Sequence, residues 1–66
     1  MYAVVKYPCN YSTFTSDVYA DCVAYLTKMN ELFVKFSLKT EQTETFLTVT
    51  NPTSETVYSI EYINQN

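Results

Sequence analysis

The chain of 66 residues contains no glycine, so each of its turns is built from residues that carry a side chain. Asparagine is the residue that best tolerates the left-handed backbone in place of glycine. The same absence removes the glycine-rich loops that close around phosphate groups. Histidine and arginine are also absent. Without histidine, the chain lacks the side chain that most often binds metal ions near neutral pH. Without arginine, it lacks the guanidinium group that makes paired hydrogen bonds to phosphate or guanine.

The length and composition predict one ordered domain over residues 1–66. Hydrophobic residues make up 47% of the chain and charged residues 17%, which is typical of a folded protein. Aromatic residues, which are included in the hydrophobic share, make up 17% of the chain, and they supply much of the core area that a short chain needs. A domain of this size has little stability in reserve, so a protein partner or a second copy of the chain is expected.

The charge balance excludes several classes of partner. Seven acidic residues and four lysines give a net charge of −3, which argues against direct binding to nucleic acid or to an anionic membrane. No apolar run approaches the roughly 20 residues of a membrane span, and the N-terminus lacks the pattern of a signal peptide. We therefore expect a cytoplasmic protein, of the producing or infected cell, whose cysteines Cys9 and Cys22 stay reduced.

The first third of the sequence indicates a hairpin followed by a helix. Valine and tyrosine at 2–7 favour a strand, Pro8 to Asn10 suit a three-residue loop, and the return strand spans 11–14. A loop that leads straight to the helix is the alternative. An amphipathic helix then begins after Ser16, the expected N-cap, and stops at Asn30.

The remainder alternates between apolar and polar residues with period two, which predicts three antiparallel strands at 32–39, 44–50 and 56–63. A turn at 40–43 sets Lys39 opposite Glu44, and a turn at Asn51 and Pro52 sets Tyr58 opposite Val49. One face of this meander packs under the helix. Its residues are Val34, Phe36, Leu38, Leu47, Val49, Tyr58, Ile60 and Tyr62.

The predicted fold is α+β, a two-layer domain with one helix on an antiparallel sheet of four to five strands, in the order β-β-α-β-β-β. One helix cannot cover both faces of the sheet, so the other face meets water or a partner. It is either an ordinary solvated face or a mixed protein interface anchored by Phe33 and Phe46. The candidate partner-binding residues are Phe33, Lys35, Glu44, Phe46, Thr48, Val57 and Glu61.

The sequence argues against catalysis and against bound cofactors or metals. No histidine is available to activate a nucleophile, and the lysines fall at exposed positions. Asp17 and Asp21 lie on one helix face, but two carboxylates are too few for a good cation site. The spacing of Cys9 and Cys22 fits neither a metal site nor a redox motif. A chain this small also struggles to enclose a pocket for a small-molecule substrate.

The composition of the chain, rather than any motif, favours one class of function. Asparagine, lysine, tyrosine, isoleucine and threonine are frequent, as in proteins from AT-rich genomes. With the small size, this favours a phage or mobile-element protein that binds and masks a host or antiviral protein, for example a CRISPR or other nuclease complex. The alternative is a homodimer that pairs its open sheet faces or edge strands, or a minor subunit of a larger assembly.

Overall fold

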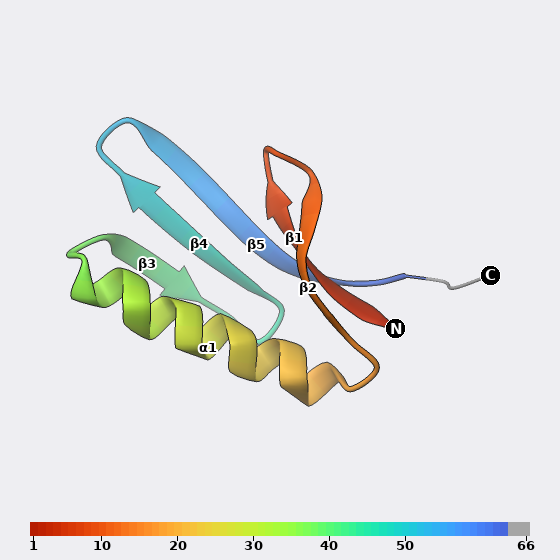
Figure 1. The fold of residues 1–66 in the computed structure, drawn as a ribbon. Helices are drawn as coiled ribbons and strands as arrows, with labels where there is room; N and C mark the ends of the chain where they lie inside the picture. The colour runs from red at the N-terminus through yellow and green to blue at the C-terminus, as the bar shows by residue number, and fades with distance from the viewer. Residues whose placement is uncertain (64–66) are drawn as a thin grey trace.

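The computed structural model describes residues 1–63, which form five strands and one helix. The elements are β1 (Tyr2–Tyr7), β2 (Tyr11–Ser16), α1 (Tyr19–Lys35), β3 (Lys39–Gln42), β4 (Phe46–Asn51) and β5 (Ser54–Tyr62). All strands join one antiparallel sheet in the order β2-β1-β5-β4-β3, and α1 packs on one side of it (Figure 1). The predicted two-layer α+β fold and its element order are confirmed.

The first hairpin forms as predicted, so the alternative of a loop leading straight to the helix is wrong. Asn10 takes the left-handed backbone at φ 59°, and its N–H donates to the Lys6 carbonyl at 2.6 Å. Pairing between β1 and β2 closes on Lys6 and Tyr11. On its other side, β1 pairs with β5, with Val4 opposite Ile60. The hairpin therefore belongs to the same sheet as the later strands.

The helix begins two residues later than the sequence indicated. Its N-cap position is Val18, which makes no side-chain capping bond, so the prediction of Ser16 as N-cap is wrong. Ser16 still organises this junction. Its Oγ accepts from the Val18 N–H at 3.1 Å and donates to Asp21 in the first helical turn at 2.8 Å. The negative charge of an acidic residue in the first turn also interacts favourably with the positive end of the helix dipole.

The helix continues through Asn30 to Lys35, so both the predicted stop at Asn30 and the predicted strand over 32–39 are wrong. The cause is a helical repeat that competes with the period-two pattern. Cys22, Leu26, Met29 and Phe33 follow each other at spacings of four, three and four, which keeps them on one helix face. All four belong to the core or pack against it.

Ser37 ends the helix in place of a glycine. Its φ is 62°, and its N–H donates to the Val34 carbonyl at 3.0 Å. The N–H of Leu38 donates to the Phe33 carbonyl at 3.1 Å, which completes a Schellman motif. Because this segment is helical, two residues that were predicted in the core lie on the surface. Val34 is 58% exposed and Phe36 is 68% exposed.

The turn predicted at 40–43 is also wrong, since β3 occupies Lys39–Gln42 and the chain reverses at 43–45. The side chain of Thr43 closes this reversal, because its Oγ1 accepts from the N–H groups of Thr45 and Phe46 at 3.3 and 3.2 Å. Lys39 consequently lies opposite Thr50 rather than Glu44.

The last hairpin forms around Asn51 as predicted, but its register differs by two residues. The Oδ1 of Asn51 accepts from the N–H groups of Thr53 and Ser54 at 3.0 and 2.8 Å, so β5 begins at Ser54. Tyr58 therefore lies opposite Leu47 rather than Val49. A shift of two residues leaves every side chain on the face that was predicted for it.

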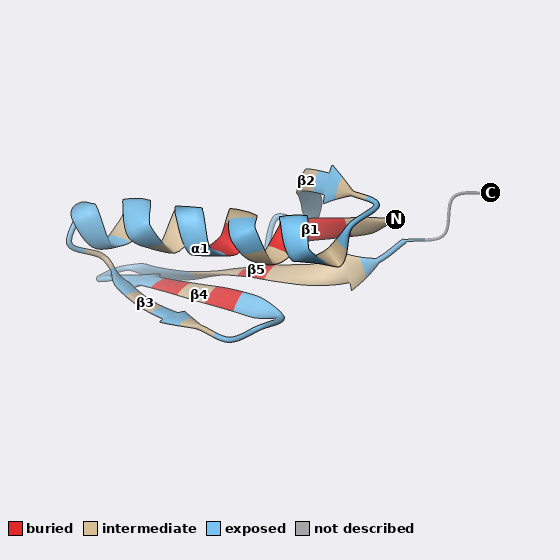
Figure 2. Ribbon diagram, turned by 90° about the horizontal axis from the view of Figure 1, so that it is seen from below, coloured by how far each residue is buried: buried red, intermediate tan, exposed pale blue. Residues whose placement is uncertain are grey.

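The core lies between α1 and the sheet, as the buried segments in Figure 2 show. Its buried members are Val4, Cys22, Leu26, Leu47, Val49 and Tyr58. Phe14 of β2 stacks on Tyr25 of the helix with ring centroids 4.6 Å apart. Tyr62, which was predicted in this core, is 68% exposed at the end of β5. Both cysteines are free, and burial raises the pKa of the Cys22 thiol.

Candidate functional site

The side of the sheet that faces away from α1 carries no other element of residues 1–63, and we call it the open face (Figure 2). Strand pairing assigns its side chains, because they alternate with the core residues Val4, Leu47 and Tyr58. They are Ala3, Val5 and Tyr7 of β1, Ser12 and Thr15 of β2, Lys39 and Glu41 of β3, Phe46, Thr48 and Thr50 of β4, and Glu55, Val57, Ser59 and Glu61 of β5.

Apolar side chains gather at the middle of the open face, and we call them the apolar centre: Val5, Tyr7, Phe46 and Val57. Val57 lies opposite Tyr7 on β1, and in the adjacent row Val5 lies opposite Ser59, which pairs with Phe46 on its other side. Phe46 is 38% exposed, while the other three are half-buried. Three different strands therefore hold an apolar patch that α1 does not cover.

A hydrogen bond within the open face ties β1 to β5. The hydroxyl of Tyr7 donates to Oε2 of Glu61, four residues along β5 from the residue opposite Tyr7. This hydrogen bond, followed by burial and by the negative charge of Glu61, raises the pKa of the Tyr7 hydroxyl above its ordinary value of 10.0. The bond ties the Tyr7 side chain to β5 across the open face.

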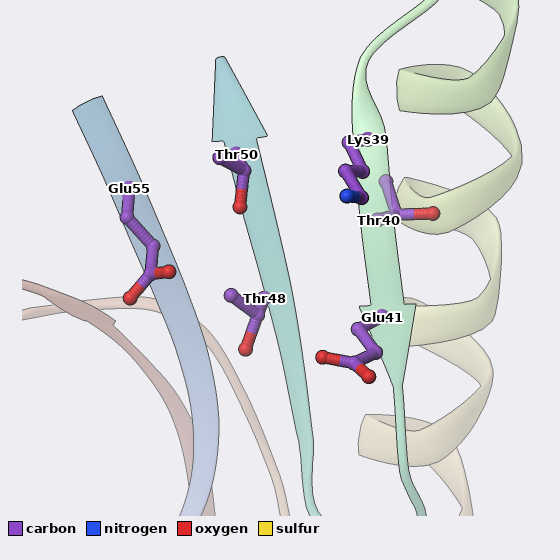
Figure 3. A pocket seen from close by; sticks show the side chains of 6 residues that line it. All are labelled: Lys39, Thr40, Glu41, Thr48, Thr50 and Glu55. Carbon is purple, nitrogen blue, oxygen red and sulfur yellow. The ribbon is translucent and has the colours of Figure 1, made fainter. Parts of the chain in front are cut away.

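Charged side chains lie on the β3 side and at both ends of the apolar centre, and we call them the charged rim: Lys39, Glu41, Glu55 and Glu61. Lys39, Thr50 and Glu55 form one row across three strands, and Glu41 lies opposite Thr48 in the next row. A hollow of about 250 Å³ lies among Lys39, Glu41 and Glu55, and Thr40, Thr48 and Thr50 complete its lining (Figure 3). Pockets for small ligands measure roughly 300–1,000 Å³ and are mostly apolar, so the hollow fits a contact surface better.

The structure brings four of the seven predicted partner-binding residues together. Phe46, Thr48, Val57 and Glu61 all lie on the open face, within β4 and β5. Phe46 and Val57 lie in adjacent rows of the sheet, as members of the apolar centre. Glu61 belongs to the charged rim. These four residues were predicted from the alternation of side chains along β4 and β5, and the structure places all four on one surface.

The other three predicted residues lie elsewhere. Phe33 is on the opposite side of the sheet, where its ring packs on Tyr58 with centroids 6.0 Å apart. Lys35 is the last residue of α1, and it is exposed. Glu44 is in the loop between β3 and β4, where its carbonyl accepts from the Tyr19 hydroxyl at 3.3 Å. All three misplacements follow from treating 32–39 as a strand paired with 44–50.

Sequence reasoning missed the contribution of β1 to this surface. Val5 and Tyr7 alternate with the buried Val4, and that alternation was visible in the sequence. The pattern did not indicate the partner of β1, because the residues of β5 that pair with it lie 50 to 60 positions further along the chain. Nothing in the local pattern distinguishes a separate hairpin from one inserted beside the last strand.

A second group of apolar residues is exposed near the C-terminal end of α1. Leu32, Val34 and Phe36 are each more than half exposed. They do not form one patch, because at 100° per residue Val34 lies about 160° around the helix from the other two. The open face is therefore the larger continuous surface that combines apolar and charged groups.

In residues 1–63, no group of three or more histidine, cysteine, aspartate or glutamate side chains is placed to hold a metal ion. The helix in this part of the chain is neither long nor apolar enough to cross a membrane. Comparison with protein-family models, with curated proteins and with solved structures finds no match to this chain.

Proposed function

We propose that this protein is a non-enzymatic binding module that docks its open face onto another protein. The observation that carries the proposal is the apolar centre, which is uncovered by α1 and bordered by the charged rim on the β3 side and at both ends. Protein interfaces commonly combine an apolar middle with a polar border, and aromatic residues are their usual anchors. Phe46 is the anchor in this proposal, and the Tyr7 ring, fixed by its bond to Glu61, extends the contact area.

The charge of the rim indicates which partner fits. Three of its four members are glutamates, so two open faces brought together would place glutamates near glutamates. Like charges in an interface oppose association, whereas complementary charges accelerate it. We therefore propose a different protein as the partner, one that presents a basic border around an apolar contact.

Small size and a composition typical of AT-rich genomes support a more specific version of the proposal. In it, the protein comes from a phage or mobile element and acts in the cytoplasm of the producing or infected cell. It masks a surface of a host or antiviral protein, such as part of a nuclease complex. Masking requires only a well-formed surface, and the open face supplies one without catalytic groups.

The test is affinity capture from a host lysate with the wild-type chain and two matched variants. Phe46→Asp places a charge in the apolar centre, while Val34→Asp places the same charge on an exposed helix residue. Circular dichroism first verifies that both variants are folded. The proposal expects the wild type and Val34→Asp to retain the same protein, and Phe46→Asp to lose it.

Two results would contradict the proposal. If folded Phe46→Asp retains the captured protein, the open face does not make the contact. If both variants lose it equally, capture reflects general hydrophobicity rather than a defined surface. A rise in salt is expected to weaken a genuine contact, because a basic border and the glutamate-rich rim attract each other less when screened.

A further inference from the structure

The two edges of the sheet differ in how they are protected. Edge strands present unpaired backbone groups, and proteins blunt them with charged side chains or by keeping them short. β3, at one edge, has four residues and carries Lys39 and Glu41. β2, at the other edge, has six residues with the sequence YSTFTS and carries no charge. By this criterion, β2 is the unprotected edge.

β2 is also held in place for pairing. Its Phe14 ring stacks on Tyr25 of α1, and Thr13 Oγ1 donates to the Val4 carbonyl at 3.2 Å. Ser12 and Thr15 are nevertheless exposed. One edge of β2 is paired with β1 and its other edge is unpaired. Because the strand is already ordered, it loses little conformational freedom when its unpaired edge binds another strand.

We infer that β2 pairs antiparallel with β2 of a second copy of this chain. The pairing inside one copy defines a consistent register. Phe14 lies opposite Val4 and Tyr11 lies opposite Lys6, both on the helix side of the sheet, with the irregular step at Thr13 between them. A two-fold axis beside Phe14 then places Phe14 next to its counterpart and Tyr11 next to Ser16 of the second copy, all on the helix side.

The charges near β2 favour a second copy in this arrangement. β2 itself brings no like charges together. The Nζ of Lys6 lies 5.9 Å from the centre of the Tyr11 ring. In the paired strands, this lysine and Asp17 of the other copy lie at the same end. Opposite charges therefore lie at the same end of the pair twice, once on each side of the axis, which is the isologous pattern of a two-fold dimer.

The resulting dimer has one continuous sheet of ten strands. Because the axis is perpendicular to the sheet, both open faces lie on the same side, and both helices lie on the other. The irregular step at Thr13 increases the twist of β2 and keeps the paired stretch short. The dimer is therefore expected to dissociate on dilution. This inference concerns the β2 edge of the sheet rather than the apolar centre of the open face, and it stands independently of the proposed function.

The experiment measures molar mass by light scattering over a concentration series for the wild type and two variants. In this register, Ser12 and Thr15 of opposite copies face each other. The double variant Ser12→Lys, Thr15→Lys places two lysines opposite each other at two positions between the paired β2 strands. It is expected to raise the dissociation constant of the dimer about tenfold. Ser12→Lys with Thr15→Glu sets opposite charges at the same positions and is expected to restore the dimer.

The control pair separates pairing from folding, since both variants change the same exposed residues and their thermal unfolding is compared directly. A wild type that stays monomeric at every concentration overturns the inference. So does a dimer that both variants weaken equally or that neither weakens, because the contact would then lie outside β2.

Discussion

Phe46 and Leu47 are neighbours in β4, yet they belong to different environments. Leu47 points toward α1 and is completely buried, whereas Phe46 points to the open face and is 38% exposed. The same alternation along β5 separates Tyr58 from Val57. One side of the sheet holds the fold together, and the other side carries apolar groups that the fold does not use.

The difference is not one of composition, because both sides contain aromatic and aliphatic residues. It comes from coverage: the chain has a single helix within residues 1–63, and that helix covers one side of the sheet. Substitutions on the covered side should therefore change stability, and substitutions on the open face should change binding.

The largest effect is expected from the neighbouring pair in β4. Leu47→Ala removes a fully buried side chain and should lower the free energy of unfolding by about 2–5 kcal/mol, because it loses transfer energy and leaves a cavity. Phe46→Ala should lower it by less than about 1 kcal/mol. Urea unfolding of both variants measures the contrast, and equal losses would show that the open face is part of the core.

A second pair tests the helical segment that the sequence misassigned. Phe33→Ala should cost about 2 kcal/mol, since the ring packs on Tyr58, while Phe36→Ala should stay within about 0.5 kcal/mol because Phe36 is mostly exposed. The strand predicted from sequence requires the reverse order, with Phe36 in the core. The order of the two unfolding midpoints decides between the two arrangements.

The smallest effect concerns the tie between Tyr7 and Glu61. The pKa of Tyr7 is raised in the folded state, so its contribution to stability is fully present below pH 10.0 and is lost as the pH rises through the folded value. The difference in unfolding free energy between the wild type and Tyr7→Phe should therefore be constant at neutral pH and shrink above pH 10. A difference that stays unchanged well above that pH would contradict the raised pKa.

The sequence predicted those features that depend on local alternation. The first hairpin, the amphipathic helix from Cys22 to Met29, and the sides on which Phe46 and Val57 lie were all available from periodicity and turn residues. Even the two-residue error in the register of β5 changed no face, because side chains in a strand repeat every two residues.

The segment 32–38 was mispredicted because two periodicities coexist in it. Leu32, Val34 and Phe36 alternate as in a strand, while Phe33 continues the helical series of Leu26 and Met29. Packing of Phe33 on Tyr58 and the left-handed stop at Ser37 accompany the helix. The packing of Phe33 on Tyr58 joins residues that are far apart in the chain, and the local pattern does not encode it.

The central claim is that the open face contacts another protein, and site-specific photocrosslinking in living cells tests it most directly. A photoreactive phenylalanine analogue is placed at position 46 in one chain and at position 36, which is exposed on the helix side, in another. The account predicts a covalent adduct with a second protein from position 46 and none from position 36. Adducts from position 36 alone, or equal adducts from both positions, would contradict it.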